Sequence, residues 1–143
     1  MFQPTRDEGR AAFIEAWRRA RQGEPLEPLQ DLCVGIIARH PEYHAVLEDA
    51  ERHVHRDWTP ESGETNPFLH LAMHLAVLEQ LSIDRPTGIR AAFEALCRRL
   101  GDRHLAEHAV MECIAEALWT ALRTGIPVNE AAYLKAVRRR SRK

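Results

Sequence analysis

The segment NPFLHLAMHLAVLEQ, residues 66–80, does most to decide the fold of this 143-residue chain. Asn66 followed by Pro67 is typical of an N-cap residue with proline at the first helical position, so a helix is predicted to begin there. At about 100° per residue its apolar side chains cover nearly the whole circumference, which predicts a buried helix. His70 and His74 lie one turn apart and point the same way. Burying two imidazoles requires polar partners, because an unpaired polar group in a core is costly.

A second helix of the same character is predicted over residues 102–123, with Asp102 as its N-cap. Apolar residues wrap most of its surface, and its polar exceptions form one narrow stripe: His104, His108, Glu112 and Glu116. A solvated face would be wider and rich in Lys and Arg. The stripe is instead typical of polar groups that point into a helical bundle.

The rest of the chain also has helical periodicity, and it has no alternating pattern typical of strands. A first helix is predicted from a capping box at Thr5 to about Gln22, with Arg10 facing solvent. Pro41 predicts a helix break at His40, because a proline disfavours a helical conformation in the residue before it. Residues 52–65 are predicted to be the longest loop.

The fold class predicted from these segments is all-α, as a compact bundle of about six or seven helices. The helices over 66–81 and 102–123 are expected to be central to it. Residues 1–137 are expected to form a single domain, and residues 138–143 a basic C-terminal tail.

Composition narrows the classes of function. The formal net charge of −1 provides no strong field, so nucleic acid is an unlikely partner despite the basic tail. The first residues carry acids and no apolar segment, and no apolar run approaches the roughly 20 residues of a membrane span. Cys33, Cys97 and Cys113 are odd in number and lie in apolar helical patterns, which indicates buried thiols and no disulfide framework. These features predict a cytoplasmic protein.

Three predicted helices each offer two metal-ligating side chains one turn apart: His44/Glu48, His70/His74 and His108/Glu112. This spacing lets both side chains of a pair reach the same ion, and bundles build metal sites from facing helices. Imidazole and carboxylate suit Fe, Mn or Zn. The hypothesis is a transition metal held by these six residues, with four others as supporting or alternative ligands: His40, His104, Glu116 and Glu79.

Two other interpretations stay open. Each pair could be a structural hydrogen-bonded pair, in which case the protein would be a non-enzymatic interaction or regulatory module that uses an exposed surface or the basic tail. If the protein is an enzyme, a metal-dependent oxidoreductase or hydrolase is expected, with Glu116 or Glu79 as acid/base. No nucleophile elbow or phosphate-binding glycine loop is present in the sequence. Partners are not specified by the sequence, and a homo-oligomer is one of the open assemblies.

Four segments resemble an uncharacterised bacterial family, domain of unknown function 1841. They are HPEYH at 40–44, NPFLHLAMHLAVLEQ at 66–80, GIR at 88–90 and HAVMECIAEALW at 108–119. The resemblance implies a small single-domain bacterial protein and brings no known activity. The pairs are also loosely similar to the iron-binding motifs of hemerythrin-like bundles. His44/Glu48 would match the first of those motifs, and His70/His74 the second. The final His-x-x-x-x-Asp motif of those bundles is missing, so oxygen carriage is not inferred.

Overall fold

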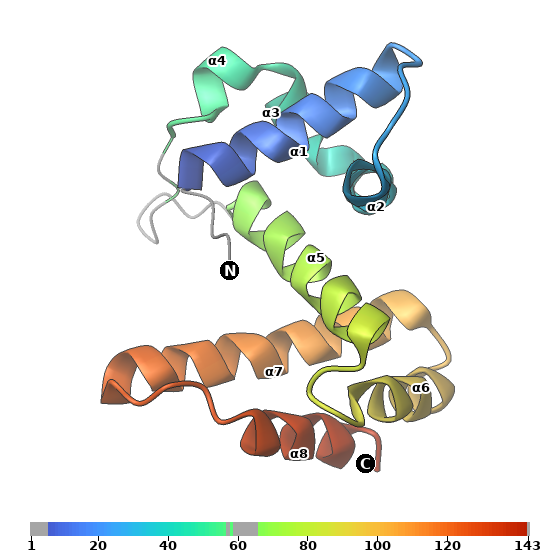
Figure 1. Cartoon of the computed structure of the whole chain (residues 1–143), viewed down its shortest axis with the longest axis vertical. Helices are drawn as coiled ribbons and strands as arrows, with labels where there is room; N and C mark the ends of the chain where they lie inside the picture. Colours follow the sequence, from blue (N-terminus) through green and yellow to red (C-terminus); the bar gives the residue numbers. More distant parts are fainter. Residues whose placement is uncertain (1–5, 57, 59–65, 143) are drawn as a thin grey trace. The chain divides into compact units, whose positions relative to one another are not determined.

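The structure is a computed structural model, and it describes residues 6–56, 58 and 66–142. Within these ranges the regular elements are eight α-helices and one 3-10 helix, with no strand (Figure 1). The all-α prediction is therefore confirmed. The elements are α1 (Arg6–Arg21), α2 (Pro28–Ala38), η1 (Pro41–Tyr43), α3 (His44–Glu48), α4 (Ala50–His53), α5 (Pro67–Ile83), α6 (Ile89–Leu100), α7 (Arg103–Thr124) and α8 (Glu130–Arg140).

The helix count exceeds the prediction because Asp49 divides one predicted segment into two. Its backbone angles, φ −119° and ψ 66°, are not helical, and they separate α3 from α4. The predicted break at Pro41 is also confirmed: α2 ends at Ala38, and His40 has φ −127° and ψ 66°. Thr5 and most of the predicted loop, residues 57 and 59–65, lie outside the described residues.

Contacts divide the chain into two compact units, Met1–Leu75 and Ala76–Lys143, and each is described by itself. The predicted single domain over 1–137 stays a prediction. The boundary falls within α5, so Pro67–Leu75 belongs to the first unit and Ala76–Ile83 to the second.

In the first unit, α1 packs against α2 and α3. The core is apolar: Phe13, Ala16, Cys33, Ile36, Ile37, Leu47, Phe68 and Leu71. Arg10 is also buried, so the expectation that it faces solvent is wrong. Its Nη1 donates to the carbonyls of Val54 and Arg56, and its guanidinium lies over the rings of Trp58 and Phe68. These contacts lower the cost of burying the cation, and they could not be read from sequence spacing along α1.

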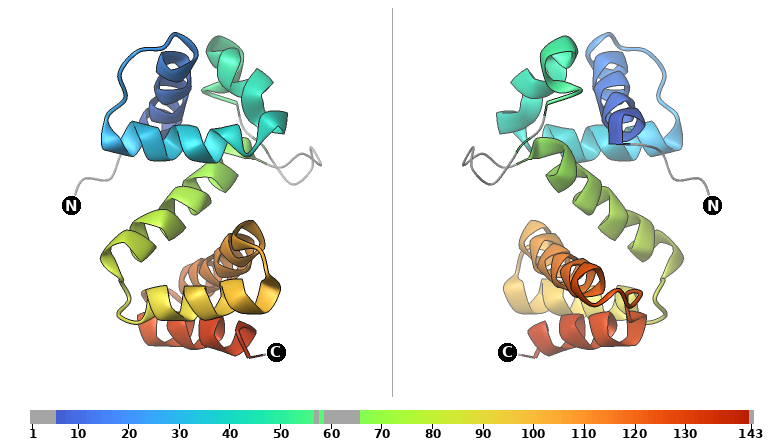
Figure 2. Two further views of the ribbon diagram at one scale, coloured as in Figure 1. Left: turned by 90° about the vertical axis from the view of Figure 1, so that its right-hand side faces the viewer. Right: turned by 90° about the vertical axis from the view of Figure 1, so that its left-hand side faces the viewer.

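In the second unit, α6, α7 and α8 pack against one another, and both views of Figure 2 show them side by side. The predicted N-cap Asp102 is confirmed, since it accepts hydrogen bonds from two amides of α7, and Asn129 caps α8 by accepting one from Ala132. Gly88 begins α6 with φ +100°, and a Cβ there would lie 2.8 Å from the guanidinium of Arg138. The positive φ favours glycine at this position, whereas the guanidinium is the end of a flexible side chain that can shift.

Neither long apolar helix is buried all round. On α5, the buried stripe contains Phe68, Leu71, His74, Val77 and Leu81, whereas Leu69 and Ile83 are exposed. On α7, the buried residues end at Ile114, and the C-terminal half is mostly exposed. The prediction of all-round burial is therefore wrong for both helices, since each keeps large apolar side chains exposed.

Three smaller findings complete the comparison with the sequence. Helix α8 continues through Arg140, so half of the predicted basic tail belongs to a helix. All three cysteines are free thiols; Cys33 and Cys113 are buried as predicted, whereas Cys97 is only partly buried. Among the described residues, none of the helices combines the length and apolarity that a bilayer crossing demands.

Candidate metal centre

Three histidines of the first unit form a cluster: His40, His70 and His74. Helix α5 carries His70 and His74 one turn apart, and His40 lies in the break between α2 and η1 that Pro41 enforces. The centre of the His40 ring is 5.0 Å from that of His70 and 4.8 Å from that of His74. The pair on α5 was predicted as ligands, and His40 was predicted only as a supporting or alternative one.

The nitrogens of His70 and His74 have a spacing that suits a shared ion. Their Nε2 atoms are 3.2 Å apart, and the ring planes are inclined by 70°. Metal–nitrogen bonds of about 2.0–2.1 Å place two ligands of one ion about 2.9–3.4 Å apart in octahedral or tetrahedral geometry. Without an ion, the same distance is a hydrogen bond in which one ring donates to the other.

His40 is held in one tautomer. Its Nδ1 lies 2.8 Å from the carbonyl oxygen of Ile36, and since a carbonyl only accepts, Nδ1 carries the proton. The lone pair of the neutral ring is then on Nε2, the arrangement in which a backbone carbonyl orients a metal-binding histidine. Each of His40 and His74 offers a ring nitrogen within 4.8 Å of the other, and both residues are nearly inaccessible, at 3% and 0% exposure.

Tyr43 flanks this cluster. Its ring is stacked on His40 at 5.5 Å between centroids and meets the edge of His70 at 5.9 Å. Burial raises the pKa of Tyr43, and the charge of Glu42 raises it further. The phenol therefore stays protonated at neutral pH, and its role is to pack against the imidazoles.

The other predicted pair of the first unit has different neighbours. The Nε2 of His44 donates to the carbonyl of Ile37 at 2.9 Å, and its ring lies 4.4 Å from that of Trp17. The indole of Trp17 donates to Glu48 at 3.2 Å, and Arg21 lies 3.9 Å from the same carboxylate. These contacts tie α3 to α1 and α2. A role as metal ligands for His44 and Glu48 stays a prediction.

In the second unit, His104 and His108 are adjacent on α7. Their ring centres are 4.3 Å apart with planes at 87°, and each offers a ring nitrogen within 4.8 Å of the other. Glu107, which was missed as a candidate and lies between these histidines in the sequence, is completely buried. A signal for it exists in the sequence, because HLAEH at 104–108 places a carboxylate between two histidines one turn apart, an arrangement that some zinc peptidases use on a helix.

Three acidic candidates lie at the surface: Glu79, Glu112 and Glu116. Glu112 accepts a hydrogen bond from Arg140 of α8 and forms an ion pair with it. The expectation that the polar stripe of α7 points inward is therefore wrong for Glu112 and Glu116. Glu112 lies on the exposed side of the buried segment of α7, and Glu116 lies beyond the end of that segment at Ile114, so both carboxylates reach solvent.

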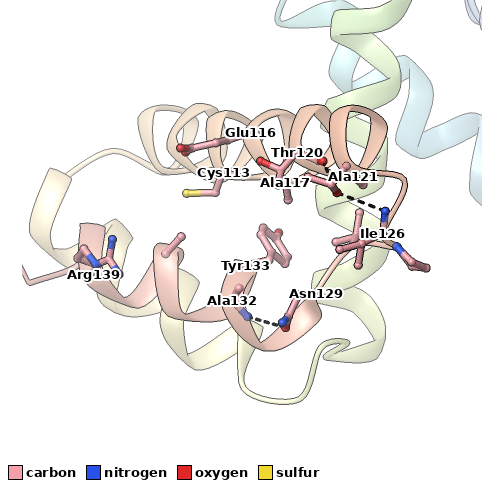
Figure 3. A pocket seen from close by; sticks show the side chains of 14 residues that line it. Cys113, Glu116, Ala117, Thr120, Ala121, Ile126, Asn129, Ala132, Tyr133 and Arg139 are labelled. Carbon is pink, nitrogen blue, oxygen red and sulfur yellow. Dashed lines mark hydrogen bonds between the residues drawn. The ribbon is translucent and has the colours of Figure 1, made fainter.

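A groove of about 370 Å³ lies between α7 and α8 (Figure 3). Its size is typical of ligand pockets. Several of its polar groups, however, have partners in the protein: Tyr133 donates to Gln80, Thr124 donates to the carbonyl of Thr120, and Asn129 caps α8. Burial raises the pKa of the Cys113 thiol, which opposes a nucleophilic role. The groove therefore provides space in which these groups are already engaged within the protein, and Glu116, the predicted acid/base residue, also lines it.

The comparisons with known proteins can now be set beside this geometry. Neither a curated protein nor a solved structure matches the chain. A family model described as a domain of unknown function, DUF1841, matches residues 5–139. Because this match covers nearly the whole sequence, the chain belongs to the DUF1841 family.

Proposed function

We propose that this protein binds a transition metal ion through the histidine cluster of its first unit. The observation that carries the proposal is the convergence of three imidazoles, His40, His70 and His74, two of which are inaccessible to solvent. Iron, manganese or zinc are the ions expected from the sequence, and imidazole nitrogen suits zinc and iron best.

Burial makes polar partners necessary for this cluster, and an ion is a partner that all three imidazoles can share. Three imidazoles side by side lose hydrogen bonds to water when they are buried. Each ring therefore needs polar partners within the protein or at an ion. The carbonyl of Ile36 binds one nitrogen of His40 and fixes the lone pair of that ring on Nε2. Three nitrogen ligands would leave coordination positions for a further ligand or for a substrate, so catalysis at the ion is compatible with this arrangement.

The proposal includes the pair on α7 as a second set of ligands. His104 and His108 offer two nitrogens on one side of a helix, and Glu107, between them in the sequence, is buried. Two imidazoles one turn apart also suit zinc or iron. An acid/base role for Glu79 or Glu116, and a cytoplasmic location, stay predictions from the sequence.

Elemental analysis of untagged protein tests the proposal. We expect stoichiometric Fe, Mn or Zn in the wild type, and its loss in His70→Ala. His44→Ala is the matched control, because the imidazole that it removes donates to the carbonyl of Ile37 and contacts the ring of Trp17. His104→Ala and His108→Ala report on the second set. Metal-free protein that shows no calorimetric binding of Zn²⁺, Fe²⁺ or Mn²⁺ would overturn the proposal.

A further inference from the structure

The C-terminal half of α7 carries an apolar stripe that faces solvent. The stripe consists of Ala115, Leu118, Trp119 and Leu122, at the three-, four- and seven-residue spacings of one helix face. Leu118 is 48% exposed, Trp119 60% and Leu122 86%. Ile126, just beyond the helix, is 66% exposed.

The exposed apolar area of this stripe is large enough for a protein–protein interface. These exposed fractions leave about 500 Å² of apolar surface, at the upper end of the largest patch on a typical monomer. Two such stripes together with their borders would bury about 1,200 Å², the lower bound of a specific protein–protein interface. A second copy of the same face therefore supplies sufficient area.

Size complementarity indicates how two copies fit. In an antiparallel pair related by a two-fold axis between Leu118 and Trp119, Ala115 of one copy faces Leu122 of the other. Leu118 then faces Trp119 of the second copy. Small residues thereby oppose large ones at both ends of the stripe, as close packing between helices requires. A two-fold interface repeats each of these contacts twice.

Charge complementarity selects the antiparallel direction. Glu116 and Arg123 lie seven residues apart, so they project along the same border of the stripe. The guanidinium of Arg123 lies 4.6 Å from the ring centre of Trp119, which places it at that border. Antiparallel helices related by a two-fold axis would bring Glu116 of each copy to Arg123 of the other, whereas parallel helices would place these residues of the two copies on opposite sides of the interface.

We infer that a second copy of this chain covers the stripe, with the C-terminal halves of two α7 helices packed antiparallel. The inference does not depend on metal binding. It specifies one assembly, a homo-oligomer, among those that the sequence left open.

Molar mass in solution tests the inference. Light scattering and sedimentation of the full chain across micromolar concentrations should give twice the monomer mass of 16.4 kDa. Leu122→Glu should weaken the dimer at least about 10-fold, because it places a carboxylate in the interface. Leu29→Glu is the matched control, since Leu29 is an exposed leucine on α2, at 53%. Unchanged circular dichroism will show that both variants are folded.

The charge pair gives the sharper test. Glu116→Arg and Arg123→Glu should each weaken the dimer several-fold, and the double swap should restore it. A wild type that is monomeric throughout the concentration range would overturn the inference. So would a dimer that is insensitive to Leu122→Glu, or single swaps that weaken it without rescue in the double swap.

Discussion

Two pairs of side chains in the first unit have the same spacing and different surroundings. His70/His74 and His44/Glu48 each lie one turn apart on a helix. On α5, the imidazole nitrogens approach each other within 3.2 Å and a third imidazole, His40, joins them. On α3, each side chain is bound to a different part of the fold.

The difference between the pairs lies in burial and in the third partner. His74 is on the covered side of α5, where polar groups of the protein or an ion must replace water around it. Glu48 is 40% exposed and accepts a hydrogen bond from Trp17, whose ring also lies 4.4 Å from that of His44. One-turn spacing therefore makes two ligands available, and the surrounding structure decides whether they converge.

The largest effect is expected for His74→Ala. Removing the inaccessible imidazole should abolish stoichiometric metal, and it should lower the melting temperature by eliminating stabilisation by the bound ion. That stabilisation is about 2.7 kcal/mol at a free ion concentration of 100 times Kd. Elemental analysis and thermal unfolding with and without chelator measure both effects. A chelator that shifts the wild type and His74→Ala equally would contradict the assignment.

His40→Gln should have the next largest effect. The variant keeps a polar side chain and loses the Nε2 lone pair that the Ile36 carbonyl orients, so Zn²⁺ affinity should fall about 10- to 100-fold. Isothermal titration calorimetry measures the change. Tyr43→Phe is the matched control, because it retains the ring that stacks on His40 and should leave the affinity unchanged.

His44→Ala should separate stability from metal binding. Loss of the bond to Ile37 and of the ring contact with Trp17 should cost about 1–2 kcal/mol of unfolding free energy. Metal content should stay at the wild-type value. Urea unfolding and elemental analysis of the same preparation provide the comparison, and metal lost in this variant would return His44 to the ligand set.

Glu48→Gln should have the smallest effect. The carboxylate is partly exposed and accepts a hydrogen bond from the indole of Trp17, which the amide oxygen of glutamine can also accept. The free energy of unfolding should therefore change by about 0.5 kcal/mol or less. Metal content should again be unaffected. A large loss of metal would make the two pairs equivalent and remove the contrast between them.

Local features were predictable because their causes are local. Asn66, Asp102 and Asn129 begin helices, and Pro41 ends one, through backbone geometry and hydrogen bonds that span only a few residues. The pair His70/His74 was also identified correctly as polar groups in an apolar helix that share one side. What each pair of side chains contacts depends on residues far away in the sequence.

Several properties of the site depended on those distant residues. The burial of Arg10 requires carbonyls more than forty residues away, at Val54 and Arg56. The central place of His40 in the cluster requires that the break at Pro41 lie against α5. Glu107 is buried by the packing around α7, whereas Glu112 on the same helix reaches Arg140 at the surface.

The sequence by itself determined an all-α chain, its helix starts and breaks, and a supply of histidines one turn apart, because these follow from periodicity and short-range hydrogen bonding. Only the tertiary structure decided which faces are covered, and hence which imidazoles meet and which leucines remain exposed. A helix with apolar residues on every side gives no preference for one buried face. The choice is made by the helices packed against it.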